Sequence, residues 1–165
     1  MDNEKLIHAI ERYERSWLLF ALVMIVVFLI FIGYTLTGFA FYVPSAAERI
    51  DPTKVHSEGS LFANPRVEKT GDNIYTAYVV AQAFNFLPGE IRVPKGARVI
   101  FYVTSPDVQH GFYIRGTNVN VQVIPGEVGK VEHTFDEAGE YLVICNEYCG
   151  LGHQDMIGKI IVEEN

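Results

Sequence analysis

The feature that most restricts this chain is an uncharged apolar run near its N-terminus. No Asp, Glu, Lys or Arg occurs from Ser16 to Val43, and the 27 residues from Trp17 to Val43 would extend about 40 Å as an α-helix. Because a bilayer core is roughly 30 Å thick, the run predicts a membrane-spanning helix that ends at Pro44. A buried core helix of this length is unusual. The run is also too long, and its leader too acidic, for a cleaved signal peptide.

The segment before this run is charged and predicts an amphipathic helix. Residues 2–15 carry seven charges, while Leu6, Ile10, Tyr13 and Trp17 recur at helical spacing. Such a helix could lie along a partner or a membrane surface, or it could be a solvated extension. Both alternatives remain open from the sequence.

The basic residues beside the apolar run indicate its orientation. Lys5, Arg12 and Arg15 precede the run, whereas only Arg49 and Lys54 follow it closely. By the positive-inside rule we expect a single-pass protein of the plasma membrane with a cytoplasmic N-terminus. The rest of the chain would then lie on the outer or periplasmic side.

Beyond the anchor, the pattern changes to short β-strands. Residues 44–72 are mixed and rich in Pro, Gly, Ser and charge, which predicts a linker and irregular cover. Residues 73–165 alternate apolar stretches with turns that contain Pro and Gly, and we therefore expect an all-β, Greek-key β-sandwich behind the N-terminal segment 1–43. The predicted strands are Ile74–Ala81, Ile91–Val93, Ala97–Thr104, Val119–Ile124, Val128–Phe135, Glu140–Ile144 and Ile157–Glu163.

Near the C-terminus, twelve residues combine two thiols, an imidazole and a thioether. The stretch reads C-N-E-Y-C-G-L-G-H-Q-D-M and places Cys145, Cys149, His153 and Met156 three or four positions apart. Soft sulfur together with imidazole is the ligand set that selects copper. The spacing lets a loop turn back towards a metal after each ligand, and we interpret it as the ligand loop of a two-copper electron-transfer centre.

Three other uses of these side chains compete with this interpretation. Paired cysteines in an exported domain often form a disulfide, and this remains the main alternative. A single blue copper uses one thiolate, two imidazoles and a thioether, and would leave the second thiol without a role. Structural zinc prefers four Cys or His ligands and binds Met poorly.

A second imidazole is expected from a distant segment. In T-S-P-D-V-Q-H-G-F, His110 follows an apolar strand and is predicted at a loop tip, where ligands often lie. The remaining histidines, His8, His56 and His133, fit better as packed or solvated residues.

These two segments resemble the CuA centre of subunit II of the haem-copper cytochrome c oxidases. The family pattern is D-V-x-H followed by C-x-E-x-C-x-x-x-H-x-x-M, and every position is filled here. The resemblance implies that Cys145 and Cys149 bridge two copper ions. It further implies that His110 and Met156 complete one copper, and that His153 and the backbone carbonyl of Glu147 complete the other.

The resemblance extends to the fold and to the partners. The run A-G-E-Y-L-V-I-C is similar to the strand that leads into the ligand loop of cupredoxins, and the single anchor resembles the B-type oxidases. The implied partners are the membrane, cytochrome c as electron donor and the haem-bearing subunit I, where oxygen is reduced to water in a proton-pumping complex. The aromatic residues Phe84 and Phe86 correspond to an electron-uptake patch, although either could instead be a core residue. Tryptophan, common in this segment of the family, is absent here.

The acidic composition limits the function further. A net charge of -7 argues against binding nucleic acid, and a mildly acidic domain is compatible with a basic donor protein. Alternatives to an oxidase subunit are an electron-transfer subunit of a nitric oxide or nitrous oxide reductase, and a module that stores or delivers copper.

Overall fold

The N-terminal segment forms one long helix. The computed structural model describes residues 3–38 and 45–164, and α1 (Asn3–Gly38) is continuous over 36 residues. The charged leader and the apolar run as far as Gly38 are therefore one element, about 54 Å long. Its most apolar 18-residue window has a mean hydropathy of 2.8 and no buried residue. In the described part of the chain it is the one helix that is long and apolar enough to cross a bilayer. The predicted end at Pro44 lies outside the described residues.

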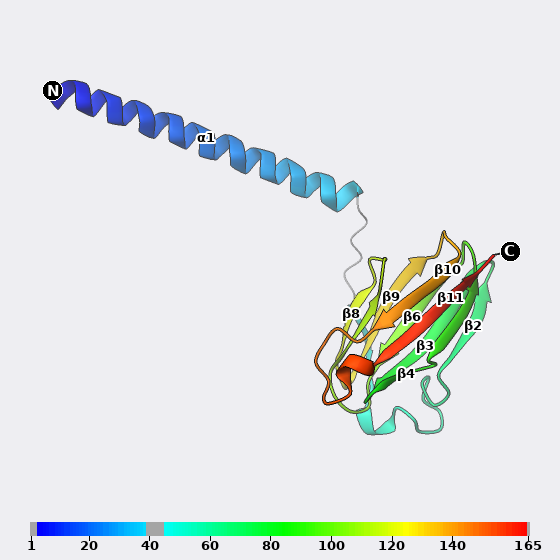
Figure 1. Ribbon diagram of the computed structural model, residues 1–165. Helices are drawn as coiled ribbons and strands as arrows, with labels where there is room; N and C mark the ends of the chain where they lie inside the picture. The colour runs from blue at the N-terminus through cyan, green and yellow to red at the C-terminus, as the bar shows by residue number, and fades with distance from the viewer. Residues whose placement is uncertain (1–2, 39–44, 165) are drawn as a thin grey trace. The chain divides into compact units, whose positions relative to one another are not determined.

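The remainder of the chain forms a separate compact unit, Val43–Asn165, which is a sandwich of two β-sheets (Figure 1). One sheet has the order β1-β9-β6-β3-β2, with β4 paired to β3, and the other has the order β5-β11-β10-β7-β8. The strands of the first sheet are β1 (Ser45–Arg49), β2 (Arg66–Gly71), β3 (Ile74–Gln82), β4 (Asn85–Leu87), β6 (Arg98–Thr104) and β9 (Glu127–Thr134). Those of the second are β5 (Glu90–Pro94), β7 (His110–Ile114), β8 (Asn120–Val123), β10 (Gly139–Ile144) and β11 (Ile157–Glu163).

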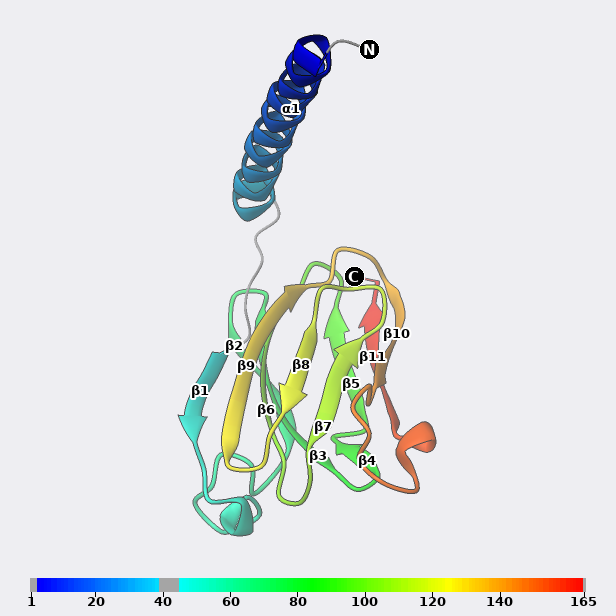
Figure 2. The same cartoon turned by 90° about the vertical axis from the view of Figure 1, so that its left-hand side faces the viewer.

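Strands that follow one another in sequence repeatedly change sheet, as sandwich topologies require. β6 lies in the first sheet and β7 in the second, and β9 and β10 are divided in the same way (Figure 2). β3 pairs in parallel with β6, and β5 pairs in parallel with β11, while the other pairs are antiparallel. The predicted all-β sandwich with one N-terminal apolar helix is confirmed.

The sandwich encloses one main hydrophobic core. Alternate residues of β6 point inward, so that Val99, Phe101 and Val103 are fully buried, and Phe101 packs against Phe112 with ring centroids 5.5 Å apart. Burying one side chain such as Phe contributes about 1.5–3 kcal/mol to the free energy of folding. The thiols of the ligand loop and Met156 belong to this same cluster. One end of the core is thus made of side chains that can bind metal.

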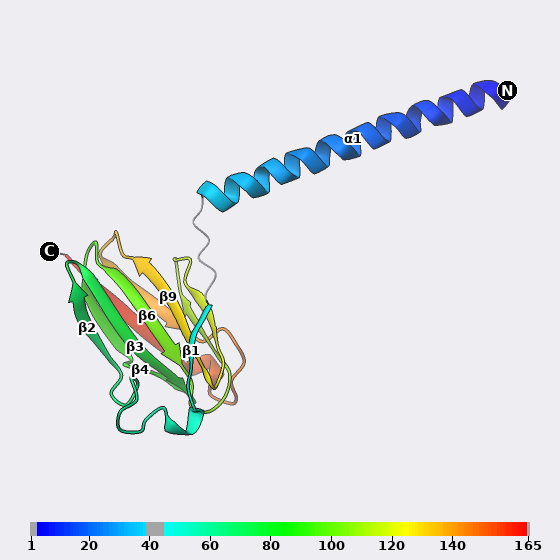
Figure 3. The ribbon, with the colours of Figure 1, turned by 180° about the vertical axis from the view of Figure 1, so that it is seen from behind.

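The segment 44–72, predicted as linker and irregular cover, contributes more structure than expected. It contains β1, which pairs with β9, and β2, which pairs with β3 along the whole strand. Between them, Val55 and Phe62 are fully buried against Val80 and Val128 in a second small cluster. Charged residues in β2 obscure its strand pattern, because an edge strand is held by its neighbour rather than by its own alternation. Seen from behind, β1 and β2 lie at opposite edges of the first sheet (Figure 3).

Candidate metal centre

The ligand loop connects two adjacent strands at one end of the sandwich. β10 ends at Ile144, the loop runs through a short 3-10 helix, η2 (His153–Asp155), and β11 begins at Ile157. The amide of Cys145 donates to the carbonyl of Met156 at 3.3 Å, which closes the loop at its base. Both ends of the loop are therefore fixed by the pairing of β10 with β11.

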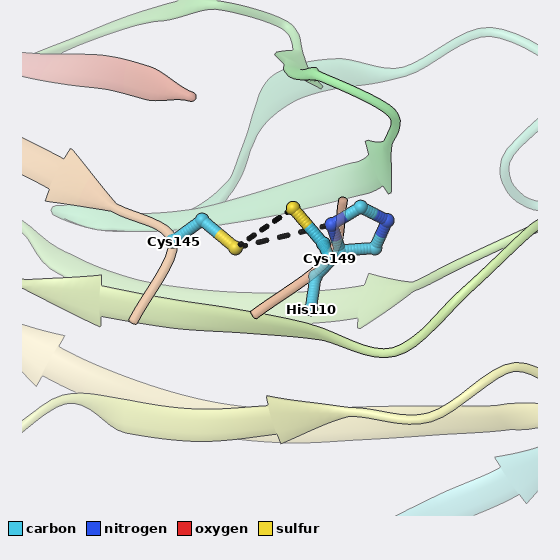
Figure 4. A group of neighbouring side chains, drawn as sticks. All are labelled: His110, Cys145 and Cys149. Atoms are coloured by element: carbon cyan, nitrogen blue, oxygen red, sulfur yellow. Dashed lines mark hydrogen bonds between the residues drawn. The ribbon is translucent and has the colours of Figure 1, made fainter. Parts of the chain in front are cut away.

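Six possible donor atoms, two of them the thiol sulfurs, lie close together in the loop region. Sγ of Cys145 lies 3.7 Å from Sγ of Cys149 and 3.9 Å from Nδ1 of His110 (Figure 4). The same sulfur lies 3.2 Å from the carbonyl oxygen of Glu147. Sγ of Cys149 lies 3.7 Å from Nδ1 of His153 and 3.8 Å from Sδ of Met156. All six predicted ligands thus meet at one place. In the described residues, His110, Cys145 and Cys149 have ligand atoms within 4.8 Å of one another.

The separations suit shared metal ions rather than a covalent bond. A disulfide requires sulfur atoms about 2.05 Å apart, and both thiols are free. Metal–sulfur and metal–nitrogen bonds of about 2.3 Å and 2.0 Å, as found for zinc, place two donors on one ion about 3.6–4.0 Å apart at angles between tetrahedral and trigonal. The contacts between thiols, imidazoles and thioether fall in that range. Because the set includes a thioether, its chemistry favours copper over zinc.

The sequence predicts His110 at a loop tip, and this prediction is wrong. His110 is the first residue of β7 and is completely buried. Its Nε2 lies 2.9 Å from Oδ1 of Asp107. The same carboxylate accepts the amides of Ala83 and Val108, each at 2.7 Å, and the hydroxyl of Ser105 at 3.0 Å. This network holds the imidazole before any metal binds.

The charge of Asp107 determines which nitrogen of His110 faces the thiols. Burial opposes ionisation of Asp107, but hydrogen bonds from Ala83, His110, Val108 and Ser105 together hold its pKa below the ordinary value. An ionised carboxylate only accepts hydrogen bonds, so Nε2 of His110 carries the proton. Nδ1, which faces Cys145, is then left with its lone pair, as a metal ligand requires.

The thiol of Cys149 is protonated at neutral pH in the absence of metal. Burial, followed by the hydrogen bond and charge of Cys145, raises the pKa of Cys149 from 9.0 to about 11. A metal must displace this proton, so metal uptake releases protons to solvent. The thiolate form of Cys149 is therefore favoured only when a cation lies nearby.

Gly111 allows the ligand loop to approach β7 closely. Its amide donates to Sγ of Cys145 at 3.5 Å. A Cβ at this position would collide with the Asn146 side chain and come within 2.9 Å of the backbone nitrogen of Glu147. Only glycine fits here, and it brings a backbone donor to the sulfur.

The two aromatic residues predicted for electron uptake have different environments. Phe86 is 2% exposed and packs edge-on against Phe112 with ring centroids 5.7 Å apart, so the core alternative holds for it. Phe84, in the turn between β3 and β4, is 39% exposed. It lies against the ligand loop beside Gly150 and Gly152.

The other histidines lie outside the site. His56 bonds to Gln82 at 3.0 Å and His133 to Asn118 at 3.1 Å, while His8 lies on the exposed helix beside Glu11. Burial lowers the pKa of His133, despite the opposing charge of Asp136. These positions agree with the packing and solvent roles expected for them.

Sequence reasoning missed the residues that hold the ligands. Asp107 belongs to the quoted motif without an assigned role, and Ala83, Ser105 and Gly111 have no role assigned either. An Asp three positions before a histidine, in S-P-D-V, could have indicated a turn carboxylate able to reach the ring. Nothing in the local sequence indicates the contact of Asp107 with Ala83, which is 24 positions away.

Comparison with known proteins agrees with the geometry. Residues 76–164 match the family described as cytochrome C oxidase subunit II, periplasmic domain, and residues 2–39 match its transmembrane segment. The chain is 52% identical over 168 aligned positions to cytochrome c oxidase subunit 2 of Thermus thermophilus, covering 99% of each.

Solved structures give the same result. A chain of a haem-copper terminal oxidase dimer is similar with a TM-score of 0.74 and 35% identity, covering 91% of this chain and 99% of that one. The periplasmic domain of subunit II from Bradyrhizobium japonicum shares the fold, with a TM-score of 0.51, 20% identity and coverage of 62% and 88%. The predicted family and oxidase function are confirmed. The chain belongs to the cytochrome c oxidase subunit II family, as a membrane-anchored, copper-binding component of a haem-copper terminal oxidase.

Proposed function

We propose that this subunit binds two copper ions in a binuclear CuA centre, accepts electrons from cytochrome c and passes them to haem in subunit I. The observation that carries the proposal is the pair of free, buried thiols 3.7 Å apart, flanked by four further donors. A single copper of the blue type has no use for the second thiol.

The ligands divide into shared and separate ones. Cys145 and Cys149 bridge both ions, His110 and Met156 complete one, and His153 with the Glu147 carbonyl completes the other. The contacts support this division in part, because each imidazole lies nearest a different sulfur. When bound, the copper pair supplies a one-electron carrier.

The chain contributes a frame that changes little when the charge of the site changes. The loop is closed at its base by paired strands, and His110 is held by Asp107. Met156 is fully buried and its backbone is part of the loop closure. A site whose ligands are fixed beforehand has little to reorganise when an electron arrives or leaves, which favours rapid transfer.

The donor is expected to dock on apolar side chains around the ligand loop. Large exposed apolar residues lie next to ligands in sequence, and Leu151 is 90% exposed. The others are Phe84 beside the loop, Val108, Tyr148 and Ile157. Residues 44–165 contain 16 acidic and 10 basic residues, so a basic donor is steered towards this domain in a salt-dependent manner.

The placement in the membrane follows the positive-inside rule. We propose that segment 1–43 is the anchor, with its N-terminus cytoplasmic, and that the copper domain lies on the outer side of the plasma membrane. In this arrangement residues 73–165 carry the proposed copper ligands, and 44–72 connects them to the anchor and adds β1 and β2 to the sandwich. Protease treatment of sealed cells should remove the domain but spare the leader.

Copper counting on the purified full-length protein tests the binuclear centre. We expect two copper ions per chain after reconstitution, together with an electron paramagnetic resonance spectrum of one unpaired electron shared by two copper nuclei. One copper per chain, with a spectrum confined to one nucleus, would contradict the proposal. Oxygen uptake by the complex that co-purifies with the chain, driven by reduced cytochrome c, tests the donor.

A further inference from the structure

The ring of Phe84 fills space that two glycines of the ligand loop leave open. A Cβ placed on Gly152 would lie 2.5 Å from Cδ2 and 2.6 Å from Cγ of Phe84. A Cβ placed on Gly150 would lie 3.0 Å from Cε1 of the same ring. The ring thus lies directly on the backbone between Cys149 and His153.

The turn that carries Phe84 is fastened to the other ligand segment. Gln82 and Asn85 are paired across the turn between β3 and β4, and the amide of Ala83 donates to Oδ2 of Asp107 at 2.7 Å. The other oxygen of that carboxylate contacts His110. A single turn therefore contacts the loop that carries His153 and the carboxylate that orients His110.

We infer that Phe84 is a positioning residue of the metal centre, which presses the segment 149–153 into the geometry that its ligands need. This role is additional to any contact that Phe84 makes with an electron donor. The inference rests on the proposed copper centre, and it assigns to the ring a function in the metal-free protein as well. The loop from Cys149 to His153 contains two glycines and only a short helical turn, so packing from outside must supply its rigidity.

The two glycines differ in a way that makes the inference testable. Gly152 has φ -96° and ψ 13°, which any residue can adopt, so only the ring opposes a side chain there. Gly150 has φ +129°, where a side chain strains the backbone whatever the surrounding space. Removing the ring should therefore rescue a substitution at Gly152 but not one at Gly150.

The experiment is a size exchange in the full-length protein, with Phe84→Ala, Gly152→Ala and the double variant. For each we would measure the rate of copper loss to a chelator, the paramagnetic resonance spectrum and, in metal-free protein, the rate of labelling of Cys149. Both single variants should lose copper about tenfold faster or more, as is typical when groups that orient ligands are removed. The double variant should return towards wild type. The return is incomplete, because Cβ of residue 84 would remain 3.1 Å from the new methyl group.

Gly150→Ala with and without Phe84→Ala is the matched control, and no rescue is expected there. The inference would be overturned if the effects of Phe84→Ala and Gly152→Ala on copper loss were additive in the double variant. It would also be overturned if Phe84→Ala rescued Gly150→Ala as well as it rescued Gly152→Ala. A Phe84→Ala variant with wild-type copper loss, spectrum and labelling would likewise contradict it. If Gly152→Ala does not fold alone but folds with Phe84→Ala, the complementarity is supported. If neither variant folds, the test is the comparison of Phe84→Ala with Phe84→Leu. Leu keeps an apolar side chain against the loop, so Phe84→Leu should lose copper more slowly than Phe84→Ala. Labelling of the metal-free thiol separates failure of this inference from failure of the copper proposal.

Discussion

The two imidazoles of the metal centre are held in contrasting ways. His110 begins a strand and is completely buried, and its Nε2 is hydrogen-bonded to Asp107. His153 begins a short 3-10 helix in the loop and is only partly buried, with its ring 5.7 Å from that of the exposed Tyr148. The first is fixed by the sheet and a charged hydrogen bond, and the second by apolar packing near the surface.

This difference separates stability from access. A ligand fixed by a buried network keeps its geometry whatever touches the surface. A ligand close to exposed apolar side chains brings the metal within reach of a docking partner. The site therefore has a rigid inner side around His110 and an accessible outer side around His153, joined by the two thiols.

Loss of a shared thiol should have the largest effect, because it removes the junction between the two sides. Cys149→Ser keeps the size of the side chain but replaces the soft donor, and we expect the two-copper resonance signal to disappear. Cys145→Ser should behave in the same way, since both sulfurs are equivalent in the proposal. An unaltered signal in either variant would exclude bridging thiolates.

Asp107→Asn should weaken the inner side strongly. The amide is not ionised and no longer enforces the proton on Nε2 of His110, so copper affinity should fall about 10–100-fold. Competition with a chelator of known copper affinity measures the affinity of each variant. The matched control is Asp155→Asn, which removes the same charge on the outer side and should change affinity little. Equal losses would show that net charge, rather than orientation of His110, controls affinity.

Leu151→Asp should affect the outer side alone. Leu151 is 90% exposed, so copper content and spectrum are expected to stay the same, while the second-order rate of reduction by cytochrome c falls about tenfold through loss of an apolar contact. Stopped-flow reduction measures this rate. Leu61→Asp, at a residue 48% exposed outside the ligand loop, is the control and should react normally. A similar decrease in both variants would point to charge rather than docking.

Met156→Leu should have a smaller and different effect. The side chain is fully buried and Leu is close to it in volume, so the fold should be retained. Copper should also be retained, because the thioether is a weak ligand, while the reduction potential shifts. A spectroelectrochemical titration detects the shift. Folded protein without copper would show that the thioether is an essential ligand.

The smallest effect concerns the stability of the metal-free protein at high pH. The pKa of Cys149 is about 11 in the folded protein against 9.0 ordinarily, so the unfolded chain releases this proton first. The corresponding stability is complete below about pH 9 and is lost as pH rises towards about 11. Urea unfolding of metal-free wild type and metal-free Cys149→Ser measures this stability as the difference between the two, because groups remote from the thiol pair titrate alike in both. A difference that does not change over this range would contradict the raised pKa.

The sequence predicted the fold well, and it identified the candidate ligands, where the information is local. The spacing from Cys145 to Met156 lies within one loop, and seven strands have strong apolar patterns, so both could be recognised along the chain. The strands β1, β2, β4 and β7 were not predicted. β4 has only three residues, β2 is charged, and β7 begins at the ligand His110, in a stretch that resembles a turn.

The supporting residues could not be predicted, because their partners are distant in sequence. Asp107 acquires its role only when the fold brings Ala83 and His110 to the same carboxylate. Likewise, Gly152 appears in the sequence as a turn residue, whereas the fold shows that it makes room for Phe84. Tertiary packing, rather than local propensity, determines these contacts.

The position of β11 sets the order of biosynthetic events. This strand follows all the other described strands in sequence, yet it lies between β5 and β10 within its sheet. A ribosome therefore completes the loop that carries Met156 before it has made the strand that anchors the loop's far end. Because β11 fixes the far end of the loop, we expect the donor atoms to take the positions described here only after β11 has been translated and has paired with β10.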